Sequence, residues 1–171
     1  ILIYITLFMK KPTYLASLFI LIFWIIPNAV AENFPTAPPW QLTTQEGKTI
    51  SLSDYQGKPV ILHFWATWCS YCKKLQPKLV ELEKKYQRSG IKIVAISFIE
   101  DDGAIPQYEI NKRGYNFITA IKGELVADQY GVRGTPTTFF INRQGQTIYK
   151  STNSDVNNPK LSLAVQEIIK R

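Results

Sequence analysis

Residues 64–74 read FWATWCSYCKK, and they contain both cysteines of the 171-residue chain, Cys69 and Cys72. Two thiols three positions apart can serve as a structural disulfide, as half of a metal site, or as a redox-active pair. Each use places different demands on the residues around the thiols, so the flanking sequence decides among them.

An apolar run precedes the cysteines and a helical pattern follows them. Residues 60–65, VILHFW, have the length and β-forming composition of a strand buried on both faces. After the second cysteine, apolar side chains recur at helical spacing up to Gly90, at Leu75, Leu79, Leu82 and Tyr86. Pro77 within this helix predicts a kink. The predicted helix begins at Cys69, where unpaired N–H groups and the helix dipole favour a thiolate.

The cysteine pair is poorly suited to a structural role. A disulfide that closes four residues would stabilise the fold by only about 2 kcal/mol in the loop-entropy model, against about 4.7 kcal/mol for a hundred-residue loop. Structural zinc requires four nitrogen or sulfur ligands, and the only histidine, His63, lies in the preceding strand. Lys73 after the second cysteine excludes a CxxCH haem-attachment motif. We therefore predict a dithiol that cycles with a disulfide, without a metal or another cofactor.

The rest of the chain alternates between strand-like and helix-like segments. Short strand-like pieces are expected around the turn signals at Glu46-Gly47 and Gln56-Gly57. Further strands are expected at 91–97, 137–141 and 147–151, a short helix within 101–115, and another helix at 124–130. Asn158 as N-cap and Pro159 at the first helical position begin a last helix that runs to 169. The order β-α-β-α-β-β-α, behind a proline-rich lead at 33–40, predicts an α/β fold with a mixed central sheet flanked by helices.

Residues 1–31 are predicted to be a signal peptide rather than part of the fold. From Met9, the only methionine, two lysines precede an apolar stretch at 14–26, and Ala29-Val30-Ala31 supplies the small-residue cleavage pattern. That stretch is short for a helix that spans about 30 Å of hydrocarbon, although the apolar residues 1–8 would lengthen an uncleaved anchor. We expect a start at Met9, cleavage after Ala31, and a periplasmic or otherwise exported domain at 32–171, soluble or tethered to the inner membrane. Such an oxidising compartment permits disulfides.

The chain is basic, with a formal charge of +7 and a pI near 9.4. Its lysines and arginines are scattered in pairs without a run of five or more, and no nucleic-acid motif accompanies them. Nucleic acid is therefore not an expected partner.

Several motifs together resemble the thioredoxin superfamily. WCSYC follows a hydrophobic strand, Pro77 stands five residues beyond the second cysteine, and Gly134-Thr135-Pro136-Thr137-Thr138 precedes FFIN. The lead APPWQL, the phrase SLSDYQGKPVILHFWATWC and the insert before GTPTTFFIN are similar to the exported TlpA/ResA-like branch of thiol-disulfide oxidoreductases. The resemblance covers nearly all of residues 37–171, and it implies a thioredoxin-like fold with an N-terminal extension and a central insert.

The resemblance also implies roles for individual residues. Cys69 corresponds to the exposed nucleophile, Cys72 to the buried resolving thiol, and Pro136 to a cis-proline beside the disulfide. Backbone groups next to Thr135 and Pro136 would pair with an extended substrate chain. Trp68, immediately before the nucleophile, is expected to be partly exposed and to support substrate binding.

Two positions depart from the family pattern. Thioredoxins carry a buried aspartate where this chain has His63, and several exported relatives carry a glutamate where it has Leu75. The usual acid that moves the proton of Cys72 is therefore absent from both places. His63 is either a replacement proton relay, because imidazole titrates near neutrality, or a hydrogen-bonded core histidine without a catalytic part. Trp65 is expected in the core.

The function that the resemblance implies is an exported thiol-disulfide oxidoreductase that acts through Cys69-Ser70-Tyr71-Cys72 on protein disulfides or dithiols. Reduction is the expected direction, with electrons from a membrane thiol protein, in cytochrome c maturation or metal-centre assembly. The same chemistry run backwards would make an oxidant or isomerase.

Two other classes of protein are alternatives. A copper-binding module would use Cys69, Cys72 and His63, since thiolates suit Cu(I). A peroxiredoxin shares the superfamily core, but its Pxxx(T/S)xxC pattern would need proline and a hydroxyl residue where this chain has Leu62 and Ala66. Peroxidase activity is therefore not expected.

Overall fold

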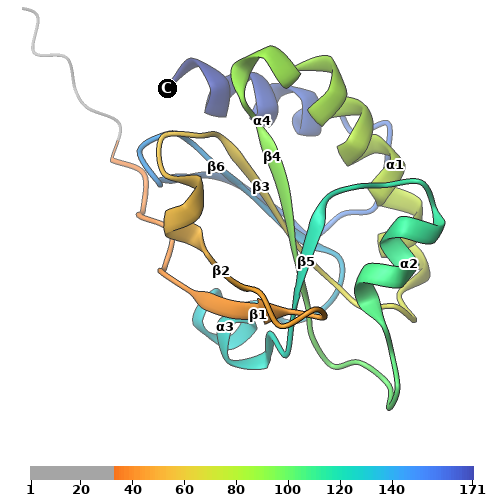
Figure 1. The fold of residues 1–171 in the computed structure, drawn as a ribbon. Helices are drawn as coiled ribbons and strands as arrows, with labels where there is room; N and C mark the ends of the chain where they lie inside the picture. Colours follow the sequence, from red (N-terminus) through yellow and green to blue (C-terminus); the bar gives the residue numbers. More distant parts are fainter. Residues whose placement is uncertain (1–32) are drawn as a thin grey trace, which may run out of the picture. The chain divides into compact units, whose positions relative to one another are not determined.

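A seven-stranded mixed sheet forms the centre of the computed structural model, which describes residues 33–171 (Figure 1). Its strands are β1 (Gln41–Thr44), β2 (Thr49–Ser51), β3 (Val60–Trp65), β4 (Lys92–Ser97), β5 (Ile118–Ile121), β6 (Thr137–Ile141) and β7 (Thr147–Ser151). Their order across the sheet is β2-β1-β5-β4-β3-β6-β7. The central strands β3, β4 and β5 run parallel, and the other neighbours pair antiparallel. The predicted mixed α/β sheet is confirmed.

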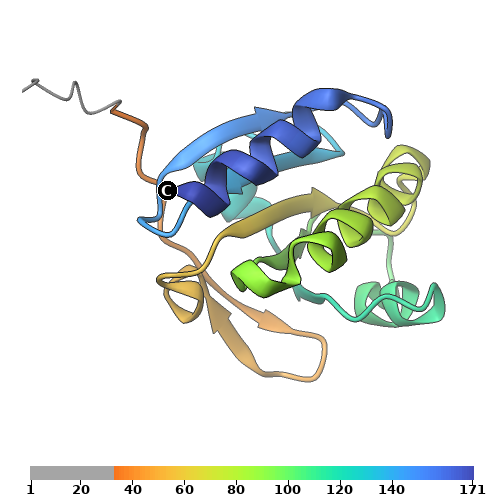
Figure 2. The same ribbon diagram turned by 90° about the horizontal axis from the view of Figure 1, so that it is seen from above.

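Helices cover both faces of this sheet. Figure 2 shows the two longer helices side by side on one face, and they are α1 (Ser70–Lys85) and α4 (Pro159–Lys170). The shorter helices are α2 (Pro106–Lys112) and α3 (Glu124–Gln129), with 3-10 turns η2 (Leu52–Tyr55) and η3 (Gln87–Ser89). Side chains of α1, α2 and α4 share one apolar cluster, whereas α3 contributes to a second cluster. We call the two sides of the sheet the α1–α4 face and the α3 face.

Strand β3 supplies both clusters because successive side chains point to opposite faces of a sheet. Ile61 and Trp65 belong to the cluster on the α1–α4 face, while Leu62 and Phe64 belong to the one on the α3 face. All six residues of β3 are buried, since the strand lies between β4 and β6 and is covered on both sides. This is the burial that the unbroken apolar run predicts.

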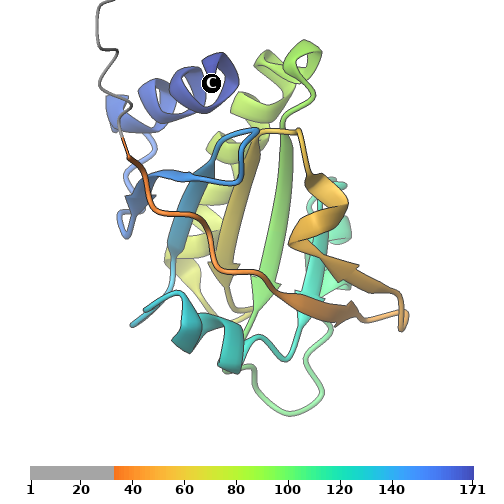
Figure 3. The same cartoon turned by 90° about the vertical axis from the view of Figure 1, so that its left-hand side faces the viewer.

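The proline-rich lead crosses the α3 face in extended form (Figure 3). It begins beside the β6–β7 turn, where the Ala37 N–H donates to the Gly145 carbonyl at 2.8 Å and the Thr147 N–H donates to the Pro35 carbonyl at 2.8 Å. It ends at β1, near the opposite edge of the sheet. Ala37 and Trp40 pack into the cluster on that face.

Helix α1 begins directly after the first cysteine, as predicted, with Cys69 as its N-cap. It ends at Lys85 rather than near Gly90, because η3 follows as a separate turn that Gly90 closes with a φ of 78°. Pro77 lies inside the helix, and the kink stays a prediction. Helix α4 begins as predicted, with the Asn158 side chain accepting from the Lys160 N–H.

One strand was not expected from the sequence. Strand β5 is only four residues long, and a short apolar piece does not by itself distinguish a strand from a loop or helix turn. Its position is defined by pairing with β4 and β1, which is a tertiary contact.

Residues 34–171 form one compact unit. The signal peptide predicted for residues 1–31, with its start at Met9 and cleavage after Ala31, lies outside the described residues. From residue 33 onward, no helix combines the length and apolar character needed to cross a membrane.

Candidate active site

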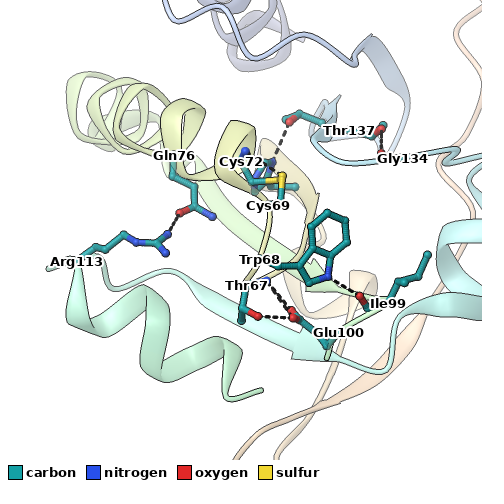
Figure 4. The surroundings of a disulfide bond; sticks show 12 residues. Thr67, Trp68, Cys69, Cys72, Gln76, Ile99, Glu100, Arg113, Gly134 and Thr137 are labelled. Carbon is teal, nitrogen blue, oxygen red and sulfur yellow. Dashed lines mark hydrogen bonds between the residues drawn. A yellow bond between two sulfur atoms is a disulfide. The ribbon is translucent and has the colours of Figure 1, made fainter. Parts of the chain in front are cut away.

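Cys69 and Cys72 are joined in a disulfide at the N-terminal end of α1 (Figure 4). The Cys72 backbone N–H donates to the Cys69 sulfur at 3.0 Å, so the sulfur caps the helix. After reduction, this N–H and the helix dipole would both stabilise a thiolate on Cys69. The geometry therefore favours Cys69 as the more acidic of the two thiols.

The burial of the first cysteine differs from the expected exposed nucleophile. Cys69 exposes 3% of its surface and Cys72 none. In the disulfide the Cys69 sulfur bonds to Cys72 and also accepts the backbone N–H of Cys72, so both sulfurs lie in the buried start of α1. Only the order of exposure agrees with the expectation.

The tryptophans before the cysteines have separate environments. Trp65 is fully buried, as predicted, and its indole N–H donates to Thr119 Oγ1 at 3.0 Å. Trp68 is 51% exposed, which confirms the predicted partial exposure, and its indole donates to the Ile99 carbonyl at 2.7 Å. Trp68 is therefore fixed beside the disulfide by the loop that follows β4 (Figure 4).

Glu100 in that same loop holds the residue before Trp68. Its two carboxylate oxygens each accept the Thr67 N–H at 3.0 Å, and they also accept the hydroxyls of Thr67 and Ser97. Glu100 was not predicted from the sequence. A signal was present in the sequence, because β3 and β4 are parallel neighbours, so an acid three residues after β4 comes close to the residues that follow β3.

The Thr135–Pro136 peptide bond is cis, as the resemblance implied. Gly134 and Thr137, on either side of this dipeptide, lie next to the disulfide in Figure 4, and the Thr137 hydroxyl donates to the Gly134 carbonyl at 2.7 Å. The segment enters β6, which pairs with β3 and so brings the loop to the end of β3 that precedes the cysteines.

His63 is fully buried on β3, and its odd position places it on the α1–α4 face with Ile61 and Trp65. Its Nδ1 lies 3.0 Å from Thr138 Oγ1, and its Nε2 has no hydrogen-bond partner among the described residues. Burial lowers the pKa of His63 from 6.5 to about 3. Desolvation therefore favours the uncharged imidazole, which fits the alternative of a hydrogen-bonded core histidine, and a part of His63 in proton transfer stays a prediction.

Gln76 is a second buried polar residue near the disulfide, and it was not predicted from the sequence. It lies four residues after Cys72 on α1, and its Oε1 accepts from Arg113 Nη1 at 2.6 Å. Arg113 follows α2 within the central insert. A glutamine in the apolar stripe of a helix is the signal that was available.

A groove of about 400 Å³ opens beside Trp68, between the start of α1 and the central insert. Apolar side chains from Trp68, Ile105 and Tyr108 line it together with charged ones from Lys73, Asp101 and Glu109. Tyr71 and Ile99, which are also largely exposed, extend the apolar surface around the disulfide. Such a surface could hold the side chains of a peptide next to its disulfide.

Across residues 33–171, no three side chains of His, Cys, Asp or Glu are grouped so that they could hold one metal ion. His63 therefore does not complete a three-ligand site with the two cysteines in this disulfide form.

Comparisons with known proteins agree with this geometry. A family model described as the AhpC/TSA family matches residues 35–150. A protein of Bacillus thuringiensis named thiol-disulfide oxidoreductase ResA is 41% identical over 113 residues, which cover 66% of this chain and 65% of that relative. The chain thus spans somewhat less than two thirds of the length of this relative.

Two solved structures are similar in fold. A putative thiol:disulfide interchange protein DsbE from Chlorobium tepidum has a TM-score of 0.67 and 26% identity, covering 78% of this chain and 98% of that one. A secreted Mycobacterium tuberculosis disulfide oxidoreductase has a TM-score of 0.63 and 25% identity, covering 75% and 95%. The sheet, the helices and the paired cysteines described above are those of a thioredoxin-like fold.

Proposed function

This chain belongs to the AhpC/TSA family, and we propose that it is an exported thiol-disulfide oxidoreductase that reduces disulfides in other proteins. The observation that carries the proposal is the Cys69–Cys72 disulfide at the start of α1, with the Cys69 sulfur accepting the Cys72 N–H. A bond between residues three apart closes too small a loop to add much stability. Its position at a helix N-terminus instead suits thiol chemistry.

The reaction begins from the reduced protein. The Cys69 thiolate attacks one sulfur of a substrate disulfide, and the electron pair of that bond leaves on the other substrate sulfur, which takes up a proton. The product is a mixed disulfide between Cys69 and the substrate. Trp68 and the backbone around Thr135 and Pro136 would hold the substrate chain during this step.

Release of the substrate is the second exchange. The Cys72 thiolate attacks the Cys69 sulfur, the bond between Cys69 and the substrate breaks, and the substrate leaves as a second thiolate. Two electrons have then passed from the protein dithiol to the substrate. The enzyme is left in the disulfide form that the structure shows.

Export is supported by the sequence pattern at 9–31 and by the similarity to a secreted oxidoreductase. A membrane thiol protein would then return electrons to Cys69 and Cys72, and cytochrome c maturation or metal-centre assembly is the proposed setting. Mass spectrometry of the processed protein should find Glu32 at its N-terminus. Retention of residues 10–31 would instead indicate an anchor.

The reduction potential of the cysteine pair tests the direction of electron flow. Equilibration with glutathione buffers should give a value near that of thioredoxin, about −270 mV, and the reduced protein should reduce insulin disulfides. A value near −120 mV would assign the protein to the oxidants. A protein that neither reduces insulin nor oxidises a dithiol peptide would contradict an exchange function altogether.

The division of labour between the two thiols can be tested with substrate trapping. Cys72→Ser should attack a disulfide substrate but fail to release it, so a covalent complex through Cys69 accumulates. Cys69→Ser should accumulate none. Trapping through Cys72 would reverse the assignment of nucleophile and resolving thiol.

A further inference from the structure

Gln76 lies on the same side of α1 as the two cysteines. It follows Cys72 by four residues and Cys69 by seven, and both spacings return to the same helix face. Helical side chains lean toward the N-terminus of their helix, which for Gln76 is the direction of Cys72. Figure 4 shows its amide group between Arg113 and the disulfide.

Arg113 fixes which way this amide is turned. A guanidinium can only donate hydrogen bonds, so the group of Gln76 that lies 2.6 Å from Arg113 Nη1 must be the oxygen. Arg113 is itself held by Glu109, with Nη2 and Oε2 3.4 Å apart. The amide nitrogen of Gln76 is therefore turned away from Arg113, and in Figure 4 it lies on the side nearer the cysteines.

The amide nitrogen of Gln76 is buried without a hydrogen-bond partner among the described residues. Buried donors in folded proteins are almost always paired, so an unpaired one needs a reason. In the oxidised protein the sulfurs of Cys69 and Cys72 are bonded to each other. Reduction would create a new acceptor, because a thiolate accepts hydrogen bonds far better than a disulfide sulfur.

We infer that the Gln76 amide is the hydrogen-bond donor to the Cys72 sulfur in the reduced protein, and that Arg113 is the residue that positions it. This inference rests on the proposed function. A fully buried thiol ionises reluctantly because burial raises its pKa. A donor one helical turn after Cys72 would favour the thiolate, in a chain that has Leu75 at the position where relatives carry an acid.

The step affected is release of the substrate. The Cys72 thiol loses its proton to solvent, its sulfur forms the bond to Cys69, and the bond from Cys69 to the substrate breaks with both electrons going to the substrate sulfur. A hydrogen bond from Gln76 raises the fraction of Cys72 present as thiolate. The first attack, by Cys69, does not depend on it.

The pKa of Cys72 can be measured directly. The charged or titratable groups on the elements around it are His63 on β3, Lys73 on α1, Glu100 after β4, and Glu109 and Arg113 on the insert. β6 and the buried side of α4 contribute only uncharged side chains. Because burial lowers the pKa of His63 to about 3, a titration between pH 6 and 10 in a Cys69→Ala background reports the Cys72 thiol.

The experiment compares Gln76→Met, which keeps the volume but removes the donor, with the unsubstituted side chain. The pKa of Cys72, followed by the ¹³Cβ shift of labelled cysteine, should rise by about one unit. In the protein with both cysteines, release of a preformed mixed disulfide should slow about tenfold at pH 7, and the difference should close at high pH. The attack by Cys69 should keep its rate.

Two further variants keep the test decisive. Arg113→Met leaves Gln76 in place but frees its amide to turn, so it should slow release about threefold in the same pH-dependent way. Gln166→Met, on α4, replaces a half-buried glutamine whose amide donates to the Tyr86 hydroxyl. This variant should change neither the pKa of Cys72 nor the rate of release. If Gln76→Met does not fold, the Arg113 variant carries the test.

An unchanged pKa of Cys72 and an unchanged release rate in Gln76→Met and Arg113→Met would overturn the inference. Failure of the proposed function has a different signature. In that case the unsubstituted protein would not form or resolve a mixed disulfide at all, while the pKa comparison in the Cys69→Ala background could still be made.

Discussion

The two faces of the sheet are built from the same strands but differ in what they bury. On the α3 face, Phe64 packs against Phe98, Tyr130 and Phe139 with ring centroids 5.5 to 6.1 Å apart. On the α1–α4 face lie the disulfide, His63 and Gln76. In the described part of the chain, two of the three buried side-chain nitrogens without a partner belong to these two residues. Aromatic packing thus concentrates on one face, and polar groups available for chemistry on the other.

Phe64→Ala is the strongest test of this separation. Removing a buried phenyl ring from the α3 face should lower the free energy of unfolding by about 4 kcal/mol. The reduction potential should hardly change, because Phe64 belongs to the cluster on the face opposite the disulfide. Urea unfolding and glutathione equilibration measure the two quantities. If the variant does not fold, Phe64→Leu should show a smaller loss in stability. A large shift in potential would show that the faces are coupled.

Low pH should reduce the stability of the fold through His63, which lies on the α1–α4 face. Between pH 6.5 and 3 the unfolded chain binds a proton at His63 and the folded protein does not, so stability falls as the pH drops through this window. At pH 4 the protonation of His63 in the unfolded chain lowers the free energy of unfolding by about 3 kcal/mol. In His63→Gln, the difference in unfolding free energy between pH 7 and pH 4 should be smaller by that amount. Identical pH dependence in both proteins would exclude a buried, uncharged histidine.

Glu100→Ala should lower the free energy of unfolding by less than the two changes above, because Glu100 is only partly buried. Losing its hydrogen bonds to Thr67 and Ser97 should lower the unfolding free energy by about 2 kcal/mol. Hydrogen exchange at the Thr67 amide should accelerate, and the α3 face should keep its protection. Asp102→Ala, at an exposed acid two residues later, is the matched control and should have little effect. Protection of Thr67 that survives in Glu100→Ala would contradict the role of this carboxylate.

Ile99→Gly should have the smallest effect on the free energy of unfolding, and it should stabilise the protein where the other changes destabilise it. Ile99 has a φ of 54°, which is costly for a β-branched residue, while its side chain is 62% exposed. Glycine relieves this strain but makes the unfolded chain more flexible, so the net gain should be about 0.5 kcal/mol in urea unfolding. Ile99→Ala keeps the strained backbone and should not stabilise. A glycine variant that is less stable than the alanine variant would mean that the conformation carries no strain.

The elements that the sequence predicted well are those whose pattern is local. Strand β3 is buried at all six positions, and α1 begins directly after the first cysteine, because an apolar run and a helical repeat meet there. The cis bond before Pro136 followed from the resemblance alone. Strand β5 has only four residues and depends on its neighbours, so its pattern did not reveal it.

The parts of the site that the sequence did not reveal depend on long-range contacts. Glu100 meets Thr67 across 33 residues, and Arg113 meets Gln76 across 37. Neither pairing follows from composition, since many acids and arginines in the chain could have filled these roles. The choice between the two alternatives for His63 depends on a similar long-range property. The residue type suggests titration near neutrality, but complete burial, a property of the assembled core, lowers the pKa of the imidazole.

The path of the lead across the α3 face also constrains the order of folding. Pro35 and Ala37 form their hydrogen bonds with Thr147 and Gly145, more than a hundred residues later in the chain. During synthesis these residues leave the ribosome well before their partners exist. The lead can therefore dock only after the β6–β7 hairpin has been made, although it comes before every strand that it crosses. Contacts of such large sequence separation are slow to form, and we expect the lead to be among the last segments of residues 33–171 to gain protection during refolding.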